Sequence, residues 1–290
     1  MYYELSDLGF LKIQGADAKK MLQGQLTCNV ESVAPLQGCM GAHCNPQGRI
    51  ISLFYLFIYQ DCYYLMLPHS MIALTLAALK KYAVFFKADL TDASNSMAAI
   101  GSTEPLPTII TAEQPAVIRI SQGTSRCIIA GTKETIQHIR EVPANAPAIT
   151  NSDAWKYLDL TDKIPSIYPE TSGKFLPHEI NLDKLGAISF DKGCYTGQEI
   201  IARMHYRGKL KNHLYMALIT SATPPSPGQD IYTEINAEAR PCGVIVDICR
   251  QAYNVYNCLI LTDTGSAEKE CLYLDADKNV TISISGTQSK

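Results

Sequence analysis

The chain changes its pattern at about residue 214, and this change constrains the fold more than any other feature of the sequence. Beyond it, short β-like runs alternate with turn sequences such as the Pro-rich segment 224–228, without a convincing helix. The runs span residues 231–235, 243–249, 258–262 and 280–285. Short strands of this kind bury their apolar faces in a barrel or a sandwich. We expect a small C-terminal β-barrel over residues 211–290.

The preceding part of the chain mixes strand and helix patterns in two series. The first predicts strands over residues 10–13, 49–59, 63–67 and 84–86 and helices over 18–26 and 70–82. The second predicts strands over 117–120 and 126–130 and a helix over 132–140. A chain of 290 residues exceeds the usual size of one core. The predicted class is α+β, with a first domain in residues 1–105 and part of 150–210, and a second in 106–150 and neighbouring segments.

Composition places the protein among folded globular chains, with 47% hydrophobic and 18% charged residues. The net charge of -3 predicts no overall attraction to nucleic acids or anionic membranes, so any polyanion site must be local. The start lacks a leader pattern, and the longest apolar runs are too short to cross a bilayer. We expect a cytoplasmic protein without membrane contact.

Ten cysteines are scattered along the chain, and no C-x-x-C pair occurs. This pattern is typical of reduced thiols rather than of a disulfide framework. It also argues against a zinc site or a four-cysteine iron–sulfur site of local spacing. No permanently bound metal is expected.

Residues 192–199 read KGCYTGQE and form the most informative motif of the sequence. Thr196 and Glu199 have the spacing of a capping box, in which each side chain bonds to a backbone amide of the first turn. This spacing predicts a helix that begins here and runs through Arg203.

Cys194 is the candidate reactive group of this motif. It precedes the predicted helix and lies two residues from Lys192, and both the helix dipole and the cation favour a thiolate. Gly193 and Gly197 suit a loop that turns sharply and presents amides to a ligand. An inert, buried thiol is the alternative interpretation.

A basic segment follows the motif, with cationic or titratable side chains at every second position from Arg203 to His213. Period two is strand geometry. A strand from about Tyr206 would collect on one face Arg207, Lys209, Lys211 and His213. Such a face would attract the carboxylate tail of a small molecule or an RNA phosphate backbone, whereas an ordinary solvated strand face is the alternative.

Two other constellations carry weaker signals. His43 and Cys44 resemble a base and a nucleophile, but neighbours on a strand point to opposite faces, so a buried cysteine and an exposed histidine are expected. Trp155 lies between Asp153 and Asp159, and an isolated large aromatic is more often a core residue than a ligand platform.

The sequence KGCYTGQEIIARMHYRGKLK resembles the YgfZ family, relatives of the aminomethyltransferase (T-protein) of the glycine cleavage system. Further similar segments are residues 15–17, 22–27, 43–49 and 176–182. The resemblance implies two α+β domains and a C-terminal β-barrel, arranged as a three-domain ring around a central cavity.

The resemblance also implies a function, in which tetrahydrofolate or a derivative is bound and iron–sulfur enzymes, notably tRNA methylthiolation enzymes, are assembled or repaired. The protein would then be an accessory factor rather than a classical enzyme. Cys194 would be the essential thiol, as a transient ligand of iron or a cluster or in redox exchange with a partner. Lys192 would hold its thiolate, and the loop geometry would be fixed by Tyr195, Gln198 and Glu199.

The expected folate contacts are incomplete in this chain. Trp155 matches one pterin-contacting tryptophan of the family, whereas Leu8 stands where a second one is expected. Thr161 replaces the family's pterin-contacting acid, which Asp162 would supply only with a shift. Two basic residues of the ladder are further candidates for cofactor binding, Arg203 and Arg207.

Two alternative functions remain open at this point. One is a folate-dependent aminomethyltransferase, which the octapeptide and the missing pterin acid disfavour. The other is an RNA-binding module, with possible tRNA contact, that uses the basic segment 207–213.

Overall fold

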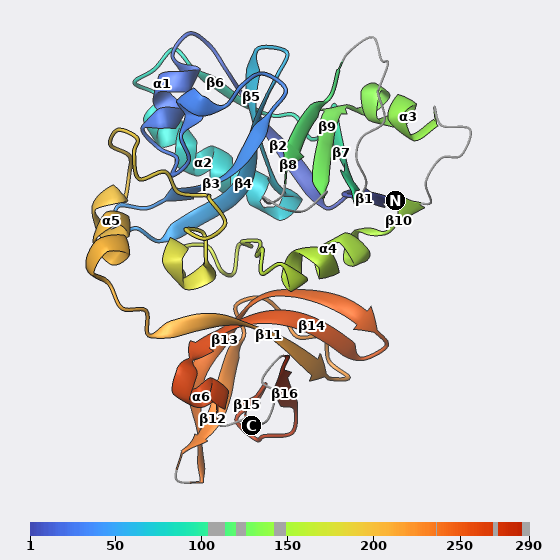
Figure 1. Cartoon of the computed structure of the whole chain (residues 1–290), viewed down its shortest axis with the longest axis vertical. Helices are drawn as coiled ribbons and strands as arrows, with labels where there is room; N and C mark the ends of the chain where they lie inside the picture. The colour runs from blue at the N-terminus through green and yellow to red at the C-terminus, as the bar shows by residue number, and fades with distance from the viewer. Residues whose placement is uncertain (104–113, 120–125, 142–148, 236, 269–271, 286–290) are drawn as a thin grey trace.

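The computed structural model describes residues 1–103, 114–119, 126–141, 149–235, 237–268 and 272–285. This part of the chain contains two five-stranded sheets and a closed barrel, with helices beside and between them (Figure 1). The arrangement confirms the α+β class and the C-terminal β-barrel. The residue boundaries of the domains stay a prediction, and Cys271 lies outside the described residues.

The first sheet is antiparallel throughout. Its strands are, in spatial order, β3 (Gly38–Cys44), β4 (Ile50–Tyr59), β5 (Cys62–Pro68), β2 (Leu8–Gln14) and β6 (Asp89–Asp92). Two helices accompany it, α1 (Ala18–Gln23) and α2 (Ile72–Ala83). Met21 of α1 and Leu79 of α2 are fully buried in the main core, because each helix carries one apolar stripe.

The strand expected over residues 84–86 is absent from this sheet. The Phe85 amide donates to the Tyr82 carbonyl, so the chain continues in a helix-like turn after α2. Phe85 is 80% exposed, and β6 begins only at Asp89. The apolar run therefore ends a helix instead of forming a strand.

The expectation of an exposed His43 is wrong as well. His43 is 1% exposed on β3, and its ring lies edge-on to that of Tyr82 with 6.1 Å between the centroids. Tyr82 belongs to α2, which covers this face of the strand. Cys44 is buried on β3 too, so alternation along the strand does not bring either side chain to the solvent.

The second sheet joins distant parts of the sequence. Its strands are, in spatial order, β10 (Ile149–Thr150), β1 (Tyr2–Glu4), β7 (Met97–Ser102), β9 (Cys127–Thr132) and β8 (Ala116–Arg119). β1 and β10 are parallel, and the other pairs are antiparallel. Helix α3 (Lys133–Glu141) packs against β7 and β9. The predicted strands 117–120 and 126–130 and helix 132–140 correspond to β8, β9 and α3, although residue 120 lies outside the described residues.

The barrel has its own apolar core, in which Ile219, Ile245 and Ile260 are fully buried. Its strands are, in spatial order, β11 (Asn212–Thr220), β14 (Val255–Asp263), β13 (Glu238–Ala252), β12 (Asp230–Ile235), β15 (Leu272–Tyr273) and β16 (Thr281–Ile284). Pairing of β16 with β11 closes it. A short helix follows β14, α6 (Thr264–Glu268).

Helix α4 (Ser152–Thr161), which no sequence pattern above indicates, lies between the barrel and the two sheets (Figure 1). Lys156 of α4 forms a salt bridge of 2.5 Å with Asp247 of β13, which is fully buried. Asp247 also accepts hydrogen bonds from the Ser166 amide and the Tyr168 hydroxyl. This network joins the barrel to the rest of the molecule.

In the described part of the chain, the remaining helices are α5 (Gln198–Arg207), which precedes the barrel, and three single turns of 3-10 helix. These turns are Val30–Ser32, His69–Met71 and Pro177–Ile180. Among the described residues, no helix has the length and apolar character needed to cross a membrane.

Candidate functional site

The loop before α5 exposes Cys194 and buries Lys192. The Lys192 ammonium donates hydrogen bonds of 2.7 Å to the carbonyl oxygens of Leu26 and Cys28. It also lies 5.2 Å from the centre of the Tyr195 ring. Burial lowers the pKa of Lys192 to about 8, because an ammonium loses hydration in the interior. Lys192 thus holds the loop to the segment after α1, while the Cys194 thiol faces solvent.

The predicted capping box at Thr196 does not form, because α5 begins at Gln198 and has Gly197 as its cap. The Thr196 hydroxyl instead donates to the Gln25 side chain at 3.1 Å. Glu199 is exposed in the first turn, and the helix start has no side-chain cap. A tertiary hydrogen bond therefore replaces the local one that the sequence suggests.

The two glycines of the loop differ in what they contribute. Gly197 has a φ of +86°, and a Cβ there would lie 2.6 Å from the Asn45 carbonyl oxygen and 3.1 Å from the Gly48 Cα. Only glycine fits such a left-handed position in close contact with another backbone. Gly193 has open space around it. The hairpin turn after β3 and the octapeptide, 150 residues apart in the sequence, are therefore neighbours.

One more polar contact and a buried ring complete the loop. The Tyr195 amide donates to the Gln198 side-chain oxygen at 3.3 Å, across the helix start. The Tyr195 ring is 7% exposed, and burial raises the pKa of its hydroxyl. Both side chains are therefore part of the loop structure.

The prediction that the basic segment forms a strand from Tyr206 onward is wrong. Helix α5 continues through Arg207 and ends at Gly208, whose amide donates to the Met204 carbonyl, and β11 begins only at Asn212. The basic residues are therefore divided between a helix, a connection and the start of the barrel. All six are exposed, namely Arg203, His205, Arg207, Lys209, Lys211 and His213.

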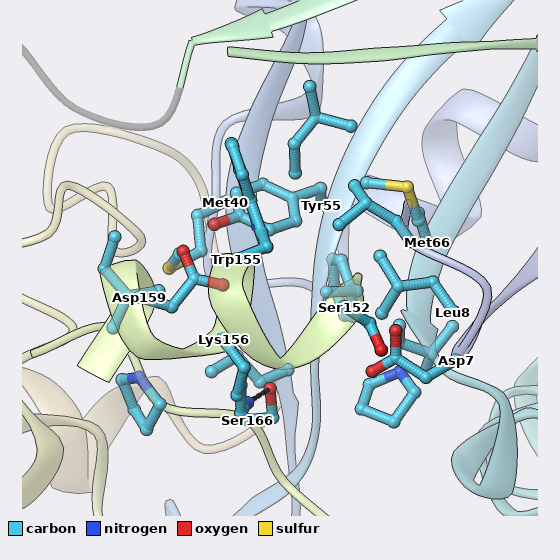
Figure 2. Close-up of a pocket in the computed structure, with 18 residues that line it drawn as sticks. Asp7, Leu8, Met40, Tyr55, Met66, Ser152, Trp155, Lys156, Asp159 and Ser166 are labelled. Atoms are coloured by element: carbon cyan, nitrogen blue, oxygen red, sulfur yellow. Dashed lines mark hydrogen bonds between the residues drawn. The ribbon is translucent and has the colours of Figure 1, made fainter. Parts of the chain in front are cut away.

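A cavity lies between α4 and the first sheet (Figure 2). Its free volume is about 50 Å³, which is room for a few water molecules. Its walls combine apolar side chains with a few polar groups, as in many ligand pockets. The labelled lining residues in Figure 2 are Asp7, Leu8, Met40, Tyr55, Met66, Ser152, Trp155, Lys156, Asp159 and Ser166.

Trp155 forms part of both the core and the cavity wall. It is 4% exposed, and its ring is tilted against Tyr3 with 5.4 Å between the centroids. The Arg126 guanidinium lies 4.8 Å from the ring centroid. A Cβ at Gly101 would come within 2.4 Å of the ring, so the close approach of β7 needs a glycine there. These contacts fix the indole in place.

The cavity wall also carries two notable polar groups, the carboxyl of Asp159 and the hydroxyl of Tyr55. Asp159 pairs with Arg126 at 3.1 Å, and burial raises the pKa of this carboxyl to about 7 although Arg126 and Lys156 oppose the shift. The Tyr55 hydroxyl is buried without a hydrogen-bond partner among the described residues. An unpaired buried hydroxyl costs free energy unless a ligand or water pairs with it. The wall thus presents an aromatic ring, a titratable carboxyl and a free hydroxyl.

The structure separates the residues that the sequence assigns to cofactor binding. Trp155 and Leu8 line the cavity, but Thr161 is exposed and its hydroxyl donates to the Tyr157 carbonyl within α4. Asp162 pairs with Arg126 at 2.6 Å instead of lining the cavity.

The cavity does not include the remaining candidates or the octapeptide. Arg203 and Arg207 lie on α5, and none of the lining residues comes from this helix or from the loop before it. Sequence reasoning missed Tyr55 and Lys156 as lining residues. It noted Asp159 only as a neighbour of Trp155, although their spacing of four residues places both on one helix face.

Metal ligation has a limited basis in the described residues, where no group of three or more His, Cys, Asp or Glu side chains gathers as a site. Cys194 offers one thiol at the surface. A metal ion or cluster held there would need further ligands from another molecule, since protein zinc and iron–sulfur sites use several.

Comparisons with curated proteins find relatives over most of the chain. A tRNA-modifying protein YgfZ of Vibrio atlanticus is 34% identical over 230 residues, which cover 77% of this chain and 71% of the relative. A YgfZ protein of Aliivibrio fischeri is 31% identical over 255 residues, covering 85% of this chain and 80% of the relative. No family model matches the sequence.

Among solved structures, the fold resembles the crystal structure of glycine cleavage system aminomethyltransferase T from Bartonella henselae. The TM-score is 0.59 at 11% sequence identity, and the match covers 99% of this chain and 85% of the other. At this identity the likeness shows a shared fold, and the family likeness rests on the curated relatives.

Proposed function

The chain belongs to the YgfZ family, and we propose on this basis that it acts in tRNA modification. In the finer form of the proposal, it is an accessory protein that supports the assembly or repair of iron–sulfur enzymes, such as tRNA methylthiolation enzymes, through Cys194. The observation that carries this proposal is the exposure of the Cys194 thiol on a loop held by buried hydrogen bonds of Lys192.

The chemistry of the loop supports transfer rather than storage. Cys194, as a thiolate, would bind iron or a cluster delivered to or taken from a partner enzyme, or exchange with a partner's thiol. Because the described residues offer one thiol there, the partner would complete the ligand set. The Lys192 ammonium is directed at two carbonyl groups, so its part in this proposal is to fix the loop.

The cavity supports a second element of the proposal, the binding of tetrahydrofolate or a derivative, which would supply a carrier of one-carbon units. Trp155 would stack on a planar ring, and the free Tyr55 hydroxyl and the Asp159 carboxyl would hydrogen-bond to its polar edge. With its raised pKa, Asp159 is able to donate as well as accept a proton near neutral pH. The residue types suit a pterin-like group, which is larger than the free space of about 50 Å³, so the ring would enter only after side chains of the wall move apart.

The test of the thiol is a Cys194→Ser variant in cells, with methylthiolation of tRNA as the readout. Activity should fall to that of cells lacking the protein. Cys62→Ser is the matched control, because this thiol is also partly exposed and lies on β5. Full activity of Cys194→Ser would refute the proposal.

The test of the cavity is a fluorescence titration of Trp155, the single tryptophan of the chain, with a reduced folate. Saturable quenching should occur. Tyr55→Phe should weaken folate binding, because it removes the buried hydroxyl that has no hydrogen-bond partner among the described residues. Thr161→Glu, which restores the acid expected in the family, should have little effect because Thr161 points away from the cavity. Absence of quenching would confine the function to the Cys194 loop.

The fold likeness alone leaves the aminomethyltransferase alternative without support from particular residues, and purified protein should form no methylene-tetrahydrofolate.

A supplementary RNA contact is favoured by one observation. Arg207, Lys209 and Lys211 are exposed without an ion pair among the described residues. Their reversal to Glu should weaken tRNA binding and reduce its salt dependence. Binding whose affinity does not depend on salt concentration would refute this RNA contact.

A further inference from the structure

Two thiols lie close together near the Cys194 loop. Cys39 and Gly41 point to one face of β3, since side chains on a strand alternate. The Cys28 sulfur lies over Gly41, where an added Cβ would come within 2.5 Å of it. The Cys28 and Cys39 side chains lie near enough for each to shift the pKa of the other, upward for Cys28 and downward for Cys39. Two segments thus bring a pair of cysteines to the same face of β3.

This pair is connected to the loop through backbone hydrogen bonds. The Cys28 carbonyl accepts one of the hydrogen bonds of Lys192, at 2.7 Å. The neighbouring Thr27 carbonyl accepts from the Ser189 amide at 2.9 Å, and the Thr27 hydroxyl donates to the Ala187 carbonyl at 2.6 Å. A displacement of Cys28 would therefore be transmitted to the chain on the N-terminal side of Cys194.

The two thiols differ in character. Cys28 is 3% exposed, whereas Cys39 is partly exposed. The neighbouring Cys28 thiol lowers the pKa of Cys39, and the nearby Lys192 charge acts in the same direction. A small oxidant in solution would thus meet Cys39 first, with Cys28 in place behind it.

We propose that Cys28 and Cys39 form a redox-active dithiol that hydrogen peroxide converts to a disulfide, and that this oxidation alters the Cys194 loop. The Cys39 thiolate attacks one peroxide oxygen, the O–O bond breaks, and the departing hydroxide takes a proton to form water. The Cys28 sulfur then attacks the sulfur of the Cys39 sulfenic acid. The S–O bond breaks, and the hydroxide leaves with the Cys28 proton as a second water.

Two thiols and one peroxide thus give one disulfide and two waters, and a dithiol reductant reverses the change. Formation of this disulfide does not depend on the function of Cys194. Its regulatory consequence rests on the proposed function of Cys194.

Disulfide formation is tested on the full chain by treatment with one equivalent of hydrogen peroxide, alkylation after denaturation, and mass spectrometry of the tryptic peptide 21–49. This peptide contains Cys28, Cys39 and Cys44. It should carry one alkyl group, on Cys44, and lose two hydrogens, and dithiothreitol should restore three alkyl groups. Three alkylated thiols after peroxide, or a bridge to Cys44, would overturn the proposal.

Matched variants locate the bridge. Cys28→Ser and Cys39→Ala should each abolish it, whereas Cys44→Ser should leave it intact. Cys39→Ala guards against a folding defect, because Cys39 is the less buried partner. Persistence of the bridge in either variant would assign it to other cysteines and overturn the proposal.

The coupling to the loop is tested by the rate at which iodoacetamide alkylates Cys194 in the native protein before and after oxidation. A severalfold change is expected in the wild type and none in Cys39→Ala after the same treatment. A disulfide without a change in this rate would overturn the regulatory consequence. The Cys194→Ser test of the proposed function uses reduced protein, so its failure is distinguishable from a failure here.

Discussion

The Cys194 loop and the Trp155 cavity use burial in opposite ways. In the loop, a buried cation, Lys192, bonds to backbone carbonyls and leaves the thiol at the surface. In the cavity, the reactive surface itself is buried, and the Tyr55 hydroxyl lacks a partner among the described residues. The loop is therefore suited to a macromolecular partner that approaches the surface, and the cavity to a small molecule that enters it.

The largest stability difference between the two regions should come from Trp155→Ala. Removal of a core indole costs about 3–5 kcal/mol, since the cavity left behind cannot be refilled. Denaturant unfolding of the variant should show this loss. Tyr157→Ala is the matched control on the same helix, because Tyr157 is 45% exposed, and equal losses in both variants would mean that the indole is not fixed as described.

Lys192→Met should have the next largest effect on the free energy of unfolding. It preserves most of the side-chain volume but leaves the Leu26 and Cys28 carbonyls without their donor. A buried acceptor without a partner costs about 1–3 kcal/mol. Lys184→Met, an exposed lysine shortly before the loop, should be close to neutral. If both variants matched the wild type, the loop would not depend on this lysine.

The two regions should respond to pH in opposite directions. The pKa of Asp159 is raised to about 7 from 3.8, so the folded state holds the proton longer and this contribution to stability falls as pH rises between about 4 and 7. The pKa of Lys192 is lowered to about 8 from 10.5, so its contribution increases between about pH 8 and 10.5. Denaturant midpoints should lose the first slope in Asp159→Asn and the second in Lys192→Met, and unchanged slopes would contradict these pKa shifts.

Cys194→Ser should have the smallest effect on stability, within about 0.5 kcal/mol, because the thiol is exposed and nothing packs on it that a hydroxyl would disturb. The same variant should show the largest loss in the cellular assay. Thermal unfolding measured beside that assay separates the two effects. Marked destabilisation would show that the thiol has a structural role.

The strands and helices with a clear apolar period could be predicted from the sequence, as β4 and α2 illustrate. The helix start at α5 could not, because the Thr196 hydroxyl bonds to Gln25, which is 171 residues away. The capping-box pattern is local, whereas this competing partner is supplied by the tertiary fold. The same reason explains His43, since α2 buries a strand face that alternation alone would leave open.

The loop and the cavity differ in how much of each could be predicted. The octapeptide lies within eight positions, so the sequence pattern itself indicated Gly197, and the family resemblance added Tyr195 and Gln198. The cavity is assembled from β4, α4 and the turn before β2, and Tyr55 carries no signal in a continuous apolar strand. For the cavity, only the spacing of four residues between Trp155 and Asp159 indicated from the sequence that two lining residues share one helix face.

The pairing of β1 with β10 sets an order for folding during synthesis. The first sheet is made by residues 8–92 and has all its strands as soon as that stretch has left the ribosome. In the second sheet, β1 can pair with β7 once residue 102 has been made, but the other edge of β1 waits for β10 at residues 149–150. The Tyr3 ring, which packs against Trp155 in the finished protein, therefore lacks this cover until α4 has been made as well.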